Sequence, residues 1–308
     1  MQILNLSAEI QGKLYSWLPH NLKAEKVVFL PDACPGKSPL PTGTAVLTRQ
    51  PDWRQFALSD CGCGMRLIKS EIPVSRLDKQ KWNELAIHLK ENKGGLGDLG
   101  GGNHFLDAIV PEGGEDVYFL IHTGSRKESG LVDEFVDQQA VFDRQFDRIV
   151  GWAEENRATI QSLVEEIVGP TQLVLDLPHN TYEELADGAV IIRKGSVRVM
   201  PGDLNVIPSS MADDIVLVRA TQMVEESLFS LSHGTGRTMS RSDSKSLARN
   251  YDWDGLYDKV MIPDLVSRAS LTTEGPFAYR GMDDCLSLLD GFVEVVERFK
   301  VVGYIGHL

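Results

Sequence analysis

The chain has 308 residues with a formal net charge of −13, and 42% of its residues are hydrophobic against 24% charged, as in ordinary globular proteins. The negative charge argues against broad, non-specific nucleic-acid binding, which needs a basic surface, although a local basic groove stays compatible with it. No apolar run approaches the ~18 residues of a membrane span and no signal peptide is recognisable, so we expect a cytoplasmic protein without membrane contacts.

Apolar patterns in the first half of the chain predict three strands and one helix. The predicted elements are strands at 27–30, 105–110 and 117–122 and a helix at 82–91. A proline-rich loop is expected directly after residue 30. If the strands at 105–110 and 117–122 form an antiparallel hairpin, His104 and His122 come together at the same edge.

The second half is expected to interleave helices and strands. The predicted helices cover 131–168 (two helices meeting near Gly151), 236–250 and 283–299, and the predicted strands are 172–177, 189–193, 197–200 and 214–218. The strands at 189–193 and 197–200 are expected to form a hairpin. Because strands and helices do not alternate strictly and no linker divides the chain, we predict an α+β fold with a single domain over 1–308.

Five residues of strong metal-ligand type occur in short polar segments, most of them rich in glycine. They are Asp60, Cys63, His104, His122 and His179. Carboxylate, thiolate and imidazole together suit a borderline divalent ion such as Mn, Fe, Co or Zn. Any one of these histidines alone is more often a hydrogen-bonded surface residue, but the same environment recurs. Five ligands exceed one tetrahedral zinc site and a thiolate can bridge two ions, so a two-metal centre of the phosphoryl-transfer type is indicated.

A further histidine lies in the glycine-rich segment Ser232-His-Gly-Thr-Gly-Arg237, which is expected to open a helix. Backbone N–H groups of Gly234 and Gly236 at a helix N-terminus would face a phosphate, and the helix dipole would favour a neutral, nucleophilic His233. Cationic residues then recur every fourth position, at Arg237, Arg241, Lys245 and Arg249. Such a stripe is often only a solvated helix face, but beside this loop a phosphate-binding role is preferred.

In this order, the motifs resemble those of the RtcB family of GTP- and Mn-dependent RNA ligases. These enzymes join an RNA 3′-phosphate or 2′,3′-cyclic phosphate end to a 5′-hydroxyl end. The segments that carry the resemblance are 31–37, 60–65, 102–105, 122–126, 179–180, 193–195, 207–211, 233–237 and 278–279. Several separate motifs in the right order are more specific than any one of them. The resemblance implies a mixed fold around a central metal cleft.

The resemblance also implies a role for each metal-ligand residue. Cys63 corresponds to a thiolate that bridges two Mn²⁺ ions. The other implied ligands are Asp60 and His104 on one ion and His122 and His179 on the other.

His233 corresponds to the histidine that the family guanylylates, with Asn103, Arg126 and Arg237 as further catalytic residues. The residues implied at the GTP site are Asn103, Asp107, Ser210, Gly234, Gly236, Tyr279 and His307. Arg126, Arg237 and Arg241 are implied contacts to phosphate or RNA. The implied sequence is attack of His233 on GTP, transfer of GMP to the RNA 3′-phosphate, and attack of the 5′-hydroxyl with release of GMP. The expected partners are therefore GTP and RNA ends, and we favour a monomer.

Three departures from the family pattern bear on the substrate. The chain ends in His307-Leu308, whereas family members commonly end in Lys-Gly with the lysine contacting guanine. Asp107 stands where the family usually has a glutamate, and the span from His122 to His179 is shorter than usual. Two other functions stay open: a two-metal phosphodiesterase or phosphatase that acts on RNA ends without GTP, and a non-catalytic protein that binds RNA ends.

Overall fold

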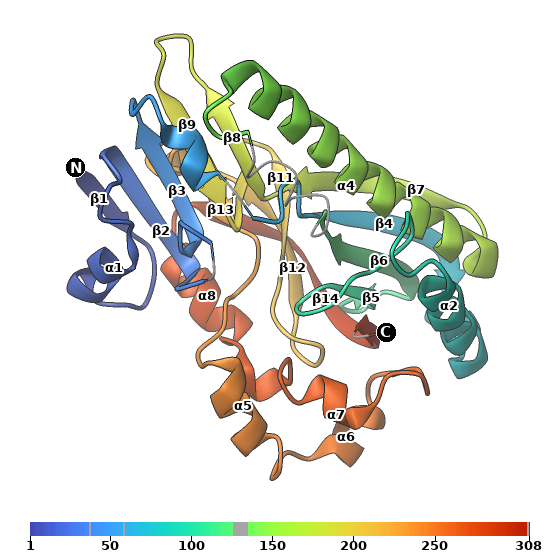
Figure 1. Ribbon diagram of the computed structural model, residues 1–308. Coiled ribbons are helices and arrows are strands. Elements are labelled where there is room, and N and C mark those ends of the chain that lie inside the picture. Colours follow the sequence, from blue (N-terminus) through green and yellow to red (C-terminus); the bar gives the residue numbers. More distant parts are fainter. Residues whose placement is uncertain (37, 58, 126–134, 307) are drawn as a thin grey trace.

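The computed structural model describes residues 1–36, 38–57, 59–125, 135–306 and 308, and Figure 1 shows how their helices and strands are arranged. Strands and helices are mixed rather than alternating, which confirms the predicted α+β class. Among the described residues, no helix is both long enough and apolar enough to cross a bilayer.

The largest sheet has seven strands, all paired antiparallel. Their spatial order is β11 (Leu204–Pro208), β12 (Ile215–Ala220), β14 (Val293–Gly306), β5 (Phe105–Pro111), β6 (Asp116–Thr123), β4 (Gly64–Pro73) and β7 (Thr171–Pro178). Its central strands are buried on both faces, which is why they have continuous apolar runs rather than alternating ones.

The second sheet has five strands and a third, small sheet has two. The five-stranded order is β1 (Gln2–Asn5), β2 (Ala24–Cys34), β3 (Thr42–Thr48), β9 (Val190–Lys194) and β8 (Asn180–Glu184). The two-stranded sheet pairs β10 (Ser196–Arg198) with β13 (Ser230–Ser232). Only the contact between β1 and β2 is parallel among the described strands of these sheets.

Helices cover both faces of the seven-stranded sheet. The α-helices are α1 (Gln11–Trp17), α2 (Lys79–Glu91), α4 (Gln139–Val168), α5 (Arg241–Leu247), α6 (Trp253–Tyr257), α7 (Arg268–Leu271) and α8 (Met282–Leu288). Short 3₁₀ turns occur at Trp53–Phe56, Val74–Arg76, Gln222–Glu225 and Pro276–Ala278. One face packs against α2 and the second half of α4, and the other against α6 and α7 (Figure 1).

The long helix α4 contacts both large sheets. Phe142, Phe146 and Ile149 from its first half pack with β2, β3 and β9, whereas Ile160 and Val164 from its second half pack with β5 and β6. Buried residues recur every three or four positions along α4, which is the helical period, and they give the helix one continuous apolar side. The middle of α4 therefore lies where the two sheets meet.

Several sequence-based boundaries are wrong, and α4 is the first case. It runs unbroken through Gly151, where two helices were predicted to meet, and residues 131–134 of the predicted stretch lie outside the described residues. Gly151 is exposed, and a glycine in a helix costs only about 1 kcal/mol, which the packing on either side outweighs. On the N-terminal side, β2 extends through Pro31 to Cys34, where a loop was predicted.

The predicted helix at 283–299 is helical only to Leu288, and its last part belongs to a strand. Only α8 is helical; Gly291 has a φ of +79°, and β14 then begins at Val293 and pairs with both β12 and β5. The acidic residues of this segment suggested a solvated helix, whereas its β-branched valines favour a strand. The predicted hairpin after residue 189 is also wrong, because β9 pairs with β3 and β8 while β10 pairs with β13 in another sheet.

Candidate active site

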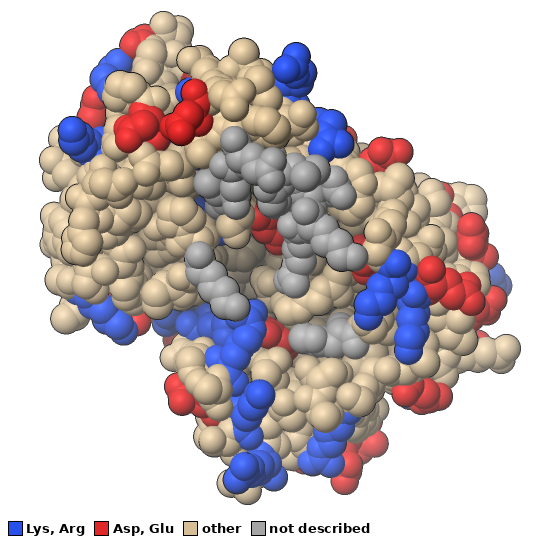
Figure 2. Space-filling view, viewed as in Figure 1, with Lys and Arg blue, Asp and Glu red and all other residues tan. Residues whose placement is uncertain are grey.

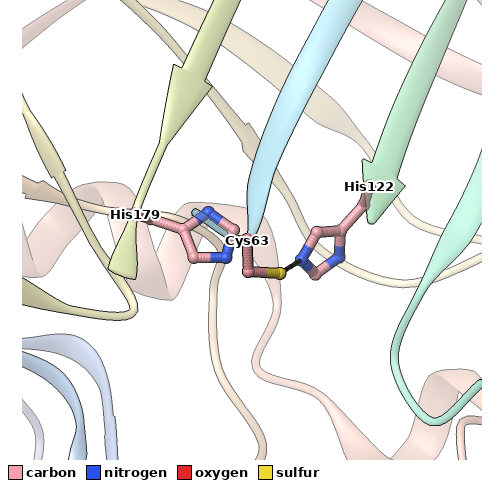
Figure 3. A group of neighbouring side chains, drawn as sticks. All are labelled: Cys63, His122 and His179. Carbon is pink, nitrogen blue, oxygen red and sulfur yellow. Dashed lines mark hydrogen bonds between the residues drawn. The ribbon is translucent and has the colours of Figure 1, made fainter. Parts of the chain in front are cut away.

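The strand register brings Cys63, His122 and His179 to one end of the seven-stranded sheet. Met65 in β4 is paired with His122 in β6, and Gly64 with Pro178 in β7. Figure 3 shows the three side chains pointing toward one another from the start of β4 and the ends of β6 and β7. Phe105 also pairs with His122, so His104 lies beside it and the predicted antiparallel hairpin is confirmed.

All five residues of metal-ligand type form one cluster. The Cys63 Sγ atom lies 3.4 Å from His104 Nε2 and 3.5 Å from His122 Nε2, and His104 Nε2 lies 3.3 Å from the Asp60 carboxylate. Ligand atoms fall into two groups whose members lie within 4.8 Å of one another: Cys63 with His122 and His179, and Asp60 with Cys63 and His104. The Cys63 thiol belongs to both groups, which is the arrangement that a shared ligand between two ions requires.

Most of the cluster is buried, and burial disfavours the charged form of two of its histidines. Cys63, His104, His122 and His179 are each at most 3% exposed. Burial lowers the pKa of His122 and His179 well below the usual value, and the neighbouring imidazoles lower these pKa values further. Neutral imidazole is the form that binds a metal, and the Nδ1 atom of His179 is buried with no hydrogen-bond partner among the described residues. The donor set therefore fits borderline divalent ions.

A close approach of two backbone segments brings Asp60 into this cluster. Ser59 and Asp60 both have positive φ angles, which turns the Asp60 carboxylate toward His104. A Cβ atom on Gly124 would lie 2.5 Å from Asp60 Oδ1 and 2.8 Å from Cys63 Cβ. Glycine is required at 124 because the chain after β6 passes directly against the ligands.

His233 lies beside the metal-type cluster and has one ring nitrogen anchored. Its ring centroid is 4.4 Å from that of His179, and its Nδ1 atom lies 2.5 Å from Asp32 Oδ2 and 2.9 Å from the Gly195 carbonyl oxygen. Both partners are acceptors, so Nδ1 carries a proton, and in the neutral ring this leaves the lone pair on Nε2. Asp32 is 2% exposed.

The helix that was expected to begin at the His233 loop is absent, so a helix dipole does not account for the state of the His233 ring. His233 follows β13, and the next helix, α5, begins only at Arg241 with Ser240 as its N-cap. Gly236 has a φ of +84°, and a Cβ atom there would lie 2.4 Å from Asp32 Cα. The loop therefore packs against the Asp32 segment instead of forming a helix, and Asp32 and Gly195 orient the imidazole in place of a helix dipole.

A cavity of about 290 Å³ opens next to His233. Every described residue predicted for the nucleotide lines it: Asn103, Asp107, Ser210, Gly234, Gly236 and Tyr279. Asp60, His122, Arg237 and Arg241 line it as well, so the cavity connects the metal-type cluster to the predicted nucleotide residues. Arg126 and His307 lie outside the described residues.

The far wall of this cavity contains a buried carboxyl group. Asp107 is 2% exposed, and its Oδ1 atom has no hydrogen-bond partner within the part of the chain that the structure describes. Burial raises the pKa of Asp107 well above the usual value. Phe105 and Tyr304 stack beside it with their ring centroids 6.3 Å apart, so an aromatic surface adjoins one unsatisfied polar group. This combination suits a flat heterocycle with polar edges.

Glu274 holds the two arginines of the cavity and was not singled out by the sequence. It is 3% exposed; its Oε2 atom accepts from Arg237 Nη1 at 2.9 Å and its Oε1 atom from Arg241 Nε at 2.8 Å. The Tyr279 hydroxyl donates to the same carboxylate. Arg237 precedes α5, so the four cations do not form one helical stripe as predicted.

Lys194 and Asn180 lie in segments that carry the family resemblance, at 193–195 and 179–180, but the sequence assigned neither of them a role. Lys194 lines the cavity, and its Nζ atom donates to the Ser59 carbonyl at 2.8 Å. Asn180 donates to the Asp60 carbonyl at 2.9 Å and accepts from the Gly195 amide at 2.8 Å. Asn180 thus joins the loop that carries Asp60 to the one that anchors His233. Its signal in the sequence is its place beside His179 in the segment 179–180, which carries the resemblance.

Comparison with known proteins agrees with this geometry. The family model described as "tRNA-splicing ligase RtcB" matches residues 144–307, which is more than half of the 308 residues. The chain belongs to the RtcB family. The match includes His179 and His233, while Asp60, Cys63, His104 and His122 precede it.

Individual relatives extend the similarity toward the N-terminus. The RNA-splicing ligase RtcB2 of Escherichia coli is 26% identical, over 90% of this chain and 87% of that protein. The RNA-splicing ligase RtcB of E. coli K12 is 27% identical over 67% of the chain, and the tRNA-splicing ligase RtcB of Nanoarchaeum equitans 25% over 70%. In both of these alignments this chain spans only 60% of the relative's length.

Proposed function

We propose that this RtcB-family protein is an RNA ligase that joins a 3′-phosphate or 2′,3′-cyclic phosphate end to a 5′-hydroxyl end. In this proposal GTP is the activating nucleotide, two Mn²⁺ ions are the metal cofactor and His233 carries GMP between steps. One arrangement supports it above all: Asp32 accepts a hydrogen bond from His233 Nδ1, so the Nε2 atom of the neutral ring carries the lone pair between a metal-type cluster and a cavity that suits a nucleotide. Relatives named RNA-splicing ligases support the same reaction class.

His233 performs the first step. Its Nε2 lone pair attacks the α-phosphorus of GTP, a nitrogen–phosphorus bond forms, the bond to the β-phosphate oxygen breaks, and pyrophosphate leaves. The imidazole becomes positively charged as this bond forms. The Asp32 carboxylate accepts a hydrogen bond from Nδ1. It stabilises the positive charge on the ring, while the proton stays on Nδ1.

Two further displacements complete the reaction. An oxygen of the RNA 3′-phosphate attacks the same phosphorus and the bond to His233 breaks. The 5′-hydroxyl oxygen then attacks the RNA phosphate, losing its proton as GMP leaves; a cyclic end must first be opened by water. Divalent ions held by the five ligands would neutralise phosphate charge in these steps. Arg237 and Arg241, fixed by Glu274, present further positive charge at the cavity wall.

Exposed cations mark where RNA leaves the cavity in this proposal. Figure 2 shows lysine and arginine side chains in a column that runs from the edge of the central hollow over α5. Arg241, Lys245 and Arg249 are exposed there, and Arg241 also lines the cavity. Within the described part of the chain, Lys245 and Arg249 make no ion pair, so their charge is available for the RNA backbone.

Covalent labelling tests the key step directly. The protein is incubated with MnCl₂ and GTP labelled at the α-phosphate, and we expect acid-labile label on wild type and none on His233→Ala. His88→Ala is the matched control, because His88 lies on α2 and does not line the cavity. Label that survives His233→Ala contradicts the proposal. If no label forms but a cyclic phosphate RNA is hydrolysed without GTP, the protein is a phosphodiesterase instead.

A further inference from the structure

Arg157 is buried directly behind the metal-type cluster, near the middle of α4. It is 1% exposed, although arginine is seldom fully buried. Its Nε atom donates to Asp176 Oδ1 at 2.6 Å, and its Nη1 atom donates to the carbonyl oxygens of Gly62 at 2.9 Å and Thr123 at 3.3 Å. One guanidinium therefore contacts three separate segments of the chain.

Each of these segments carries a candidate ligand. The Gly62 carbonyl belongs to the peptide group that also contains the Cys63 nitrogen, and Thr123 directly follows His122. Asp176 lies in β7, whose end delivers His179. The guanidinium of Arg157 thus fixes the relative positions of the backbone on which Cys63, His122 and His179 are mounted.

Asn156, the preceding residue of α4, supports the fourth ligand segment. It is fully buried; its Nδ2 atom donates to the Asp98 carbonyl at 2.9 Å and its Oδ1 atom accepts from the Gly97 amide at 2.7 Å. The next carbonyl, that of Leu99, lies 3.2 Å from His104 Nδ1 and sets the orientation of that ring. Asn156 therefore holds the segment that positions His104.

We propose that Arg157, assisted by Asn156, is a positioning residue that preorganises the metal centre. The inference rests on the metal site of the proposed function but on neither its nucleotide nor its RNA. Ligands from four segments must meet at one place. If these segments could move relative to one another, metal binding would have to fix them at a cost in conformational entropy. The planar guanidinium of Arg157 fixes the segments before a metal binds. A lysine ammonium cannot reach Asp176 and the carbonyl oxygens of Gly62 and Thr123 at the same time.

A purely structural role for Arg157 can be separated from this one because the chain contains a matched residue. Arg66 in β4 is 7% exposed and bonds to the other oxygen of Asp176, at 2.8 Å. Its remaining recorded partner is Gln161 Oε1 at 3.0 Å, which belongs to no ligand segment. Arg66→Lys therefore disturbs an ion pair to the same buried carboxylate without releasing the carbonyl oxygens of Gly62 or Thr123.

The test is metal binding by the full-length protein, measured by calorimetric titration with MnCl₂ and by visible absorption with CoCl₂. We expect Arg157→Lys to lower Mn²⁺ affinity by about 10- to 100-fold, the usual effect of an outer contact to ligands, and to shift the cobalt bands. Arg66→Lys should leave affinity within about twofold and the cobalt spectrum unchanged. Equal losses in the two variants, normal binding by Arg157→Lys, or no binding by wild type would overturn the proposal.

A second variant covers the case in which Arg157→Lys does not fold, which near-ultraviolet circular dichroism reports. Asn156→Ala should weaken one of two Mn²⁺ binding events, the one that depends on His104, and spare the other. Unchanged binding at both sites would count against the inference. Wild type that binds metal but takes no label from GTP refutes the proposed function alone, because the titrations contain neither GTP nor RNA.

Discussion

On the metal side of the cavity, buried imidazoles and a thiol lie at strand ends in paired register and are backed by α4. The nucleotide side combines loops with Asp107 of β5 and Tyr304 of β14. Hydrogen bonds behind the metal side join neighbouring segments to Arg157 and Asn156. On the nucleotide side, Glu274 already pairs both arginines, while the Oδ1 atom of Asp107 has no partner among the residues that the structure describes.

This difference predicts that the positions of the metal-type residues are more strongly constrained than the side chains on the nucleotide side. Shifting a ligand on the metal side would disturb paired strands of the central sheet, so the cluster is constrained by the fold itself. The backbone of Asp107 is held by strand pairing too, opposite Tyr304 and Leu120, but its Oδ1 atom has no hydrogen-bond partner among the described residues. Two departures from the family pattern, Asp107 and His307, fall on residues predicted for the nucleotide, and His307 lies outside the described residues. We therefore expect large effects from changes to the cluster and smaller ones from changes around the cavity.

The largest effect is expected at the ligand shared by both groups. Cys63→Ala removes the thiol from each group, so Mn²⁺ affinity should fall by more than about a hundredfold, beyond the loss typical of outer contacts. Cys61→Ala is the control, because Cys61 is equally buried but packs in the core of the five-stranded sheet. Calorimetric titration of both variants checks this, and similar affinities would contradict a metal role for Cys63.

A second large effect is expected at Asp32. Asn at this position can present its amide N–H to His233 Nδ1, which moves the imidazole proton to Nε2 and blocks attack. The rate of labelling by α-labelled GTP should fall by about a hundredfold or more. Mn²⁺ affinity of the same variant should stay unchanged, since Asp32 belongs to neither ligand group. A normal labelling rate would show that Asp32 does not set the tautomer.

A moderate effect is expected on the column of cations over α5. Removing both Lys245 and Arg249 by alanine substitution should weaken binding of single-stranded RNA several-fold. The slope of log affinity against log salt should fall by about 1.4, because each phosphate contact contributes about 0.7. Lys13→Ala with Lys79→Ala is the charge-matched control, since both lysines are about half exposed and lie on α1 and α2. Equal slopes in the two double variants would exclude this path.

The smallest effect is a change in stability at Asp107. Burial raises its pKa, so the folded protein holds this proton more tightly than the unfolded chain, which releases it near the ordinary value of 3.8. The free energy of unfolding of wild type therefore decreases as the pH rises above that value. The free energy of unfolding of Asp107→Asn does not decrease for this reason, because asparagine does not titrate. Urea unfolding at pH 5 and pH 8 should show the variant gaining relative to wild type at the higher pH. A relative loss would reveal a partner for the carboxylate.

Sequence patterns predicted the elements in which local physics and tertiary packing agree. The strands at 105–110 and 117–122 were found because both of their faces are buried, which leaves an uninterrupted apolar signal. The hairpin then follows from a short turn, and the meeting of His104 with His122 follows from the hairpin. The segment at 283–299 failed because the exposed face of β14 carries acidic residues that resemble a solvated helix.

Contacts between distant segments could not be predicted in the same way. Asp32 and His233 are 201 residues apart, and no local period indicates that they meet. Glu274 and Arg157 were missed for the same reason, because each acts through partners on other elements. The five metal-type residues were found by chemical type, and the structure brings all five together; their binding of an ion stays a prediction.

The position of β14 has a consequence for biosynthesis. It follows every other described strand in the chain, yet it lies between β12 and β5 in the seven-stranded sheet. A nascent chain that has emerged through β13 already has Cys63 and all of the candidate histidine ligands, but the edges of β12 and β5 are still open to other strands. Tyr304, which completes the aromatic wall beside Asp107, arrives only with β14. The nucleotide side therefore forms last. A ribosome-bound intermediate is expected to contain all of the candidate metal ligands before its nucleotide cavity is complete.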